Sequence, residues 1–176
     1  LIAQDTTKYG LDLYEKLKLA DLLEELHKIE SLHWIRVLYM YPDEITKELI
    51  ETFAKYDCLV KYFDIPIQHA NNRILDKMNR RGTKELIRHI IKTIRDKIPT
   101  AIIRTTLIVG FPTETTKEFN ELKAFVEEIK FDHLGVFTYS DEDDTIGYTM
   151  FPKVRQSTME NRRNQIMELQ YNINSN

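Results

Sequence analysis

Arg104 lies inside an apolar run that extends from Ile102 to Val109. A guanidinium without a partner would be costly to bury in such surroundings, so Arg104 needs an anion. Two anions meet this need: the carboxylate of a bound ligand, held by both arms of the guanidinium, or an acidic side chain such as Asp64 in an interior ion pair. We favour the ligand.

Gln68 and His69 follow Asp64-Ile65-Pro66, where proline ends a predicted strand. Their side chains are therefore expected to point over the end of the sheet, where the amide of Gln68 can hydrogen-bond a ligand hydroxyl or carboxylate. A lone histidine at a strand end is more often a structural hydrogen-bonding residue, so His69 is a secondary candidate.

Asp5 comes after Gln4 and the apolar run Leu1-Ile2-Ala3, which looks like the end of another strand. It is either a hydrogen-bond acceptor for a ligand or an ordinary cap that closes the turn at Thr6-Thr7, and the residues alone leave both open. Because the chain enters this turn directly from what looks like the end of a strand, we expect further sequence upstream.

Ile108, Gly110 and Phe111 end a further strand, and a glycine there allows either close approach of a ligand or a tight turn into the next helix. Glu114 is expected to do no more than favour the dipole of that helix. Phe137 and Tyr139 end the last predicted strand, where they either flank a flat ligand or pack in the core.

Two charged loops complete the candidate residues. Asn79-Arg80-Arg81-Gly82 is basic and Asp141-Glu142-Asp143-Asp144 is acidic. Each is either a solvated loop or a contact for an oppositely charged partner.

Short apolar strands alternate with amphipathic helices along the whole chain. Leu19, Leu22, Leu23, Leu26 and Ile29 mark the buried face of the first helix. The sequence predicts helices at 17–29, 43–55 (capped by Asp43), 73–78, 84–97, 117–129 and 155–176, and strands at 34–40, 60–66, 101–109 and 133–139.

This alternation predicts an α/β fold with a parallel sheet, either doubly wound or closed into a barrel. No strand is followed by a glycine-rich phosphate loop, and polar residues gather at successive strand ends, which favours a barrel with its ligand at the carboxyl ends of the strands. The helix at 155–176, with Met159, Ile166, Met167 and Leu169 inward, either docks on the barrel's edge or leads elsewhere.

The formal net charge of −3 gives no basic field for DNA, and no run of about 20 apolar residues predicts a membrane span. The single cysteine, Cys58, excludes internal disulfides and any iron–sulfur or zinc site built from several cysteines of this chain. We expect a cytoplasmic protein.

Five segments occur in this order, one at the strand end Leu1-Ile2-Ala3 and one for each of the four predicted strands: LIAQDTTKYG, WIRVLYMYP, YFDIPIQHANNRILDKMNRRGT, RTTLIVGFPTET and LGVFTYSDEDDT. The chain closely resembles RimO-type methylthiotransferases over essentially its whole length. MiaB-type enzymes, which modify adenosine in transfer RNA, share IVGFP-x-ET and the MNR segment but usually begin with a GQN-like motif.

The resemblance implies a partial (β/α)6 barrel of the radical S-adenosylmethionine type, here lacking its first β/α unit. It also implies two four-iron four-sulfur clusters in the intact protein, an electron donor, and methylthiolation of an aspartate β-carbon of a small-subunit ribosomal protein. The cluster loop CxxxCxxC would lie upstream of Leu1, so we expect the chain alone to be inactive. The implied domains are the barrel at 1–151 and, at 152–176, a helix and tail leading to an absent TRAM domain.

The resemblance assigns cofactor contacts to the strand ends and leaves the catalytic residues unknown. Gln4 and Asp5 would hold the amino group of the cofactor methionine, and residues 108–112 would pack against adenine. The expected cofactor-binding residues are Gln4, Asp5, Gln68, Arg104, Ile108, Gly110, Phe111, Phe137 and Tyr139. The alternatives are a transfer RNA methylthiotransferase and a noncatalytic barrel fragment that binds the ribosome.

Overall fold

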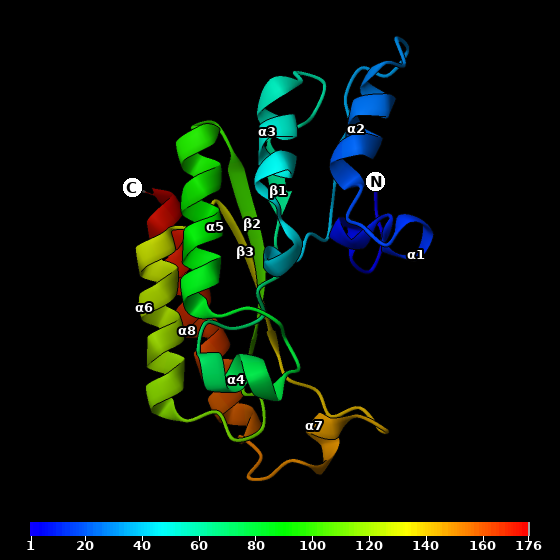
Figure 1. The fold of residues 1–176 in the computed structure, drawn as a ribbon. Helices are drawn as coiled ribbons and strands as arrows, with labels where there is room; N and C mark the ends of the chain where they lie inside the picture. The colour runs from blue at the N-terminus through cyan, green and yellow to red at the C-terminus, as the bar shows by residue number, and fades with distance from the viewer. Residues whose placement is uncertain (176) are drawn as a thin grey trace. The chain divides into compact units, whose positions relative to one another are not determined.

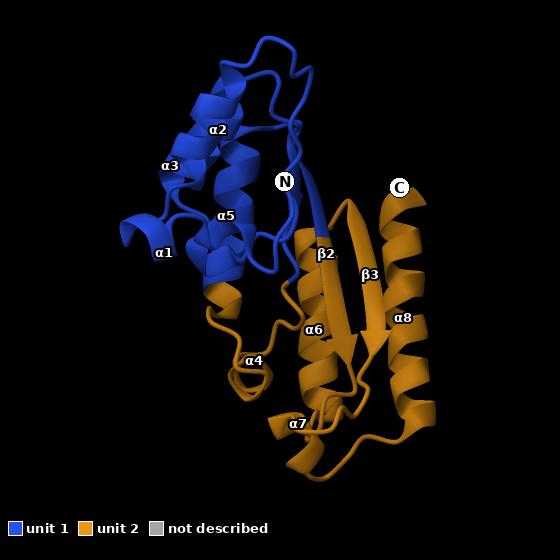
Figure 2. Ribbon diagram, turned by 90° about the vertical axis from the view of Figure 1, so that its right-hand side faces the viewer, with its two compact units in different colours: residues 1–66, 86–104 blue, residues 67–85, 105–176 orange. Residues whose placement is uncertain are grey.

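The computed structural model describes residues 1–175 and divides into two compact units. Unit 1 comprises residues 1–66 and 86–104, and unit 2 comprises residues 67–85 and 105–176 (Figure 2). From β1 to β3, strands and helices alternate as the sequence predicts (Figure 1). In chain order they are η1 Thr6–Lys8, α1 Leu11–Tyr14, α2 Leu19–His27, η2 Pro42–Glu44, α3 Lys47–Lys55, β1 Tyr62–Asp64, α4 Asn72–Lys77, α5 Lys84–Lys97, β2 Ile102–Val109, α6 Thr116–Ile129, β3 His133–Thr138, α7 Ile146–Thr149 and α8 Gln156–Ser175.

The strands form one sheet in the order β1-β2-β3. β1 pairs in parallel with the first residues of β2, with Asp64 opposite Arg104. Along β2, residues 103, 105, 107 and 109 are buried, whereas 104, 106 and 108 are half-buried and 102 is exposed. One face of this strand is therefore covered and the other is more open, with the side chains of Arg104 and Ile108 on the open face.

In unit 1, two further extended segments lie beside β1. The amide of Leu38 donates to the carbonyl of Leu1 at 3.1 Å, and Ile35 forms a parallel bridge with Leu59. The prediction of a continuous strand at 34–40, covered on both faces, was wrong: Trp34 is 65% exposed, and Tyr39 has a φ of 57°, which interrupts the extended backbone.

The helices of unit 1 begin and end differently from the prediction in two places. Asp43 does not cap α3: Pro42 begins the short helix η2, and the hydroxyl of Thr46 accepts from the amide of Leu49 at 3.1 Å. The buried face of α3 includes Leu49, Ile50 and Phe53. Ile29 lies beyond the end of α2 and is 46% exposed, so its predicted burial was wrong.

In unit 2, α6 and α8 pack against one another, and α8 packs along β3 (Figure 2). Helix α6 begins with a reciprocal capping box in which Thr115 and Glu118 each accept from the other's backbone amide. Helix α8 buries Met159 and Ile166, as predicted, whereas Met167 is 43% exposed. Its place on the inner face is taken by Arg162 and Gln170, because both find buried acceptors.

Candidate functional site

Gln68 forms backbone hydrogen bonds to β2 through both its amide and its carbonyl. Its amide donates to the carbonyl of Thr106 at 2.9 Å, and its carbonyl accepts from Ile108 at 2.8 Å. The residue has a φ of 66°, and its side-chain Oε1 is buried with no hydrogen-bond partner among residues 1–175. A buried acceptor without a partner is expected where a ligand completes the hydrogen bonding.

Phe111 and Tyr139 meet at the carboxyl ends of β2 and β3. Their rings make an edge-to-face contact with centroids 5.2 Å apart, and the amide of Tyr139 donates to Val109 at 2.9 Å. Both rings line a hollow of about 300 Å³ in unit 2. Burial raises the pKa of Tyr139 above its usual 10.0.

The surroundings of Gly110 explain why glycine stands there. Its φ is 79°, and a Cβ added to it would collide with the side chain of Met159 from α8. The predicted close approach of a ligand therefore does not apply to the side of Gly110 where a Cβ would stand. The amide of Gly110 is also engaged, since it donates to the carboxylate of Glu114.

Glu114 has more partners than the sequence predicts. Its side chain is fully buried, and its carboxylate lies 3.3 Å from Arg162 and 3.6 Å from Nε2 of His69. Nδ1 of His69 accepts from the amide of Asn71 at 2.9 Å, which places the ring proton on Nε2. Glu114 thus joins three segments of unit 2, rather than only favouring a helix dipole.

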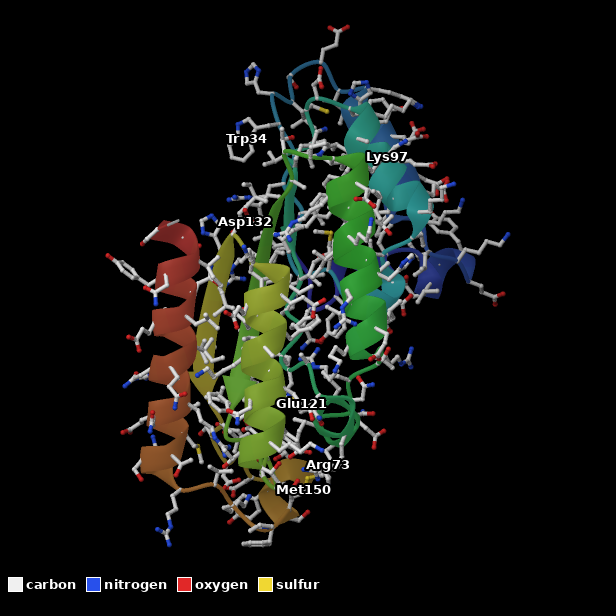
Figure 3. The ribbon with its side chains drawn as sticks, turned by 90° about the vertical axis from the view of Figure 1, so that its left-hand side faces the viewer. Trp34, Arg73, Lys97, Glu121, Asp132 and Met150 are labelled. Carbon is white, nitrogen blue, oxygen red and sulfur yellow. The ribbon has the colours of Figure 1, made fainter. Side chains whose placement is uncertain are left out.

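A second polar cluster connects α4 to α6. Arg73 pairs with the carboxylate of Glu118 and donates to the carbonyl of Thr113 at 2.8 Å, and Asn71 donates to Glu121 at 2.6 Å. Figure 3 labels Arg73 of α4 and Glu121 of α6 in this part of unit 2. The hydrogen bond from Arg73 lowers the pKa of Glu118 to about 2, because it stabilises the charged form.

The candidates of unit 1 have internal partners. Arg104 donates to Asp64 at 2.6 Å, and this hydrogen bond raises the pKa of Arg104. The second oxygen of Asp64 accepts from the amide of Tyr39 at 3.1 Å. The anion that Arg104 requires is therefore the acidic side chain considered as the alternative, although 36% of the Arg104 side chain is still exposed.

Asp5 caps the short helix η1, since its carboxylate accepts from both the amide and the hydroxyl of Thr7. Gln4 beside it is exposed. In unit 2, Phe137 is 61% exposed and its ring does not line the hollow beside Phe111 and Tyr139. Within residues 1–175, no group of three or more histidine, cysteine or acidic side chains is arranged to hold a metal ion.

None of the helices within residues 1–175 has both the length and the apolar composition to cross a bilayer. The protein-family comparison matches residues 3–126 to the model described as the radical SAM superfamily. Two solved structures of Streptococcus suis SuiB share the fold. The first aligns with a TM-score of 0.57 and 18% identity, and the second, bound to S-adenosylmethionine, with 0.54 and 17%; each covers 93% of this chain and 34% of the other.

Curated relatives carry the description ribosomal protein uS12 methylthiotransferase RimO. The one from Clostridium novyi (strain NT) is 53% identical over 99% of this chain, and the one from Clostridioides difficile (strain 630) is 54% identical over 98%. The one from Thermotoga sp. (strain RQ2) is 45% identical over 99%. This chain spans 39% of the first two relatives and 41% of the third. With a family match over most of its length and the partial barrel of that fold, the chain belongs to the radical SAM superfamily.

Proposed function

We propose that this chain is the larger part of the radical S-adenosylmethionine barrel of a transferase that adds a methylthio group to the β-carbon of an aspartate in ribosomal protein uS12. The proposal rests on one observation: proteins described as uS12 methylthiotransferases are 45–54% identical to it over nearly its whole length. The substrate places the reaction in the cytoplasm, and an electron donor is required to start it.

The residues of unit 2 fit the nucleoside part of S-adenosylmethionine. Phe111 and Tyr139 offer aromatic surface at the edge of a hollow. Gln68, which pairs with β2, offers a buried side-chain acceptor without a partner. Ile108, Gly110 and Phe137 belong to the same strand ends. When bound, the cofactor supplies a carbon-centred radical that removes hydrogen from the substrate.

Arg104, Gln4 and Asp5 are the remaining residues that we propose as cofactor contacts. The exposed part of the Arg104 guanidinium keeps donors beyond those given to Asp64, and these would hold the cofactor carboxylate. Gln4 and Asp5 would hold its amino group, with Asp5 also serving as the cap of η1.

The iron–sulfur clusters do not fit this chain. A cluster of the radical-generating kind needs three thiolates, and Cys58 is the only cysteine in the sequence. We therefore assign the cluster ligands to another part of the intact protein, and we expect the chain by itself to give no turnover.

The test uses the full-length protein that contains this chain, with its clusters reconstituted. Incubation with S-adenosylmethionine, a reductant and uS12 should add one methylthio group to an aspartate, detected by tandem mass spectrometry. Transfer RNA is tested in parallel, and methylthiolation of its adenosine instead would overturn the proposed substrate. Binding of ribosomes with no product on either substrate would support the noncatalytic alternative.

A binding assay tests the cofactor site separately. Phe111→Ala should raise the Kd for S-adenosylmethionine roughly 5- to 160-fold, because stacking with an aromatic ring contributes about 1–3 kcal/mol per base. Tyr171→Ala is the matched control, since this ring is 72% exposed on α8 and away from the hollow. Equal affinities for the two variants would remove Phe111 from the site.

A further inference from the structure

An exposed apolar surface lies on the segment that connects β3 to α8. We define residues 141–153 as the α7 segment. Ile146, Tyr148 and Phe151 within it are 69%, 48% and 75% exposed. Such clusters mark interaction sites more often than isolated exposed residues do. We propose that the α7 segment is the surface that binds a cationic stretch of the protein substrate, an inference that rests on the proposed function.

The charges of the segment favour a cationic partner. Asp141 is paired with Lys153. Glu142, Asp143 and Asp144 form no ion pair in the part of the chain that the structure describes, residues 1–175. Three carboxylates beside exposed apolar side chains complement lysine and arginine and repel the phosphates of a nucleic acid. A ribosomal protein is basic because it binds ribosomal RNA, so it meets this requirement.

Lys153 gives the segment a defined shape. Besides Asp141, its Nζ donates to the carbonyls of Gly147 at 2.8 Å and Tyr148 at 3.0 Å. The same ammonium lies 5.5 Å from the ring of Phe151 and 5.6 Å from that of Tyr148. One side chain thus connects both ends of the segment, which lowers the entropy cost of presenting its apolar residues to a partner.

The position of the segment suits a substrate-binding role. Helix α7 lies beyond the carboxyl ends of β2 and β3 (Figure 2). Glu142, Ile146 and Gly147 line the same hollow as Phe111 and Tyr139, the rings proposed to contact the cofactor. A substrate carbon must come within reach of the cofactor to lose hydrogen, so a surface that continues from that hollow is placed to present it.

The experiment measures binding of purified uS12 to the reconstituted full-length protein by fluorescence anisotropy. Asp143→Lys/Asp144→Lys should raise the Kd at least about tenfold at low salt, and less as salt is added, because the new charges repel a cationic partner. Phe151→Ala should weaken binding with little dependence on salt. The control Glu127→Lys/Glu168→Lys makes the same change in net charge on exposed positions of α6 and α8 and should leave binding unchanged.

Binding of S-adenosylmethionine should be the same in all these variants, which shows that the fold and the cofactor site are intact. If the wild-type protein binds uS12 and the α7 variants bind it equally well, the α7 segment is not the binding surface, while the proposed function stands. If the wild-type protein neither binds nor modifies uS12, both are overturned.

Discussion

The imidazole of His69 and the carboxylate of Glu114 face one another in the interior of unit 2, with Nε2 3.6 Å from Oε1 and both side chains fully buried. The same carboxylate accepts from the amide of Gly110 and lies 3.3 Å from Arg162. One acidic residue therefore fixes the turn after β2, the segment before α4 and the start of α8. A group that satisfies several buried donors is expensive to remove.

Glu114→Ala should lower the free energy of unfolding by about 3–5 kcal/mol, because it leaves the buried guanidinium of Arg162 without its anion. Glu114→Gln should cost less, since the amide still accepts from Gly110. Urea unfolding followed by circular dichroism measures both. A loss below about 1 kcal/mol for Glu114→Ala would mean that Arg162 finds water or another acceptor.

The Arg73–Glu118 pair should make the free energy of unfolding depend on pH. Folding lowers the pKa of Glu118 from its usual 4.5 to about 2, so the unfolded chain binds more protons than the folded one between these values. The contribution is present above pH 4.5 and is lost as the pH falls toward 2. Because 44% of the Arg73 side chain is exposed and screened by water, we expect roughly 1–2 kcal/mol.

The measurement compares wild type with Glu118→Gln by urea unfolding between pH 7 and pH 3. The difference in stability should be largest at neutral pH and shrink below pH 4.5. Glu127→Gln is the control, because Glu127 is exposed on the same helix. A difference that stayed constant with pH would show that the pair contributes no charge-dependent stability.

Gly110→Ala should destabilise the protein by about 2–4 kcal/mol, combining the strain of a positive φ with the collision against Met159. Adding Met159→Ala should recover the part due to the collision and leave the part due to strain. Thermal unfolding of the two single variants and the double variant separates these contributions. Strict additivity of the single effects would contradict the predicted contact.

Replacing Arg104 should lower the free energy of unfolding more than replacing Asp64, since the Asp64 side chain is buried and that of Arg104 is partly in water. Arg104→Met leaves the buried carboxylate behind and should cost about 2–4 kcal/mol, whereas Asp64→Asn leaves a guanidinium that water reaches and should cost about 1 kcal/mol. Chemical denaturation of both variants tests the order. The reverse order would place the critical charge on Arg104.

Local patterns in the sequence predict the main elements of this fold well. Helix α5 has the predicted bounds, and α6 and β2 differ by one residue at one end. Amphipathic spacing and apolar runs depend on neighbouring residues, so a single sequence contains them. The same patterns fail at η2, where the turn at Pro42 delays the start of α3 to Lys47.

Contacts between distant residues could not be predicted in the same way. The cap formed by Thr46 is local, but the sequence offers both Asp43 and Thr46 as caps, and only the turn at Pro42 decides between them. The burial of Glu114 depends on Arg162, which is 48 residues away. The sequence identified Asp64 as a possible partner of Arg104, but only the pairing of β1 with β2 brings the two side chains together.

β3 comes last in the order of the sheet, with β2 on one side and no second neighbouring strand among residues 1–175. It carries Gly135, with open space where a side chain would stand, and the exposed ring of Phe137. An edge strand of this kind offers main-chain donors and acceptors to an extended peptide. We therefore expect copies of the chain at high concentration to associate along this edge.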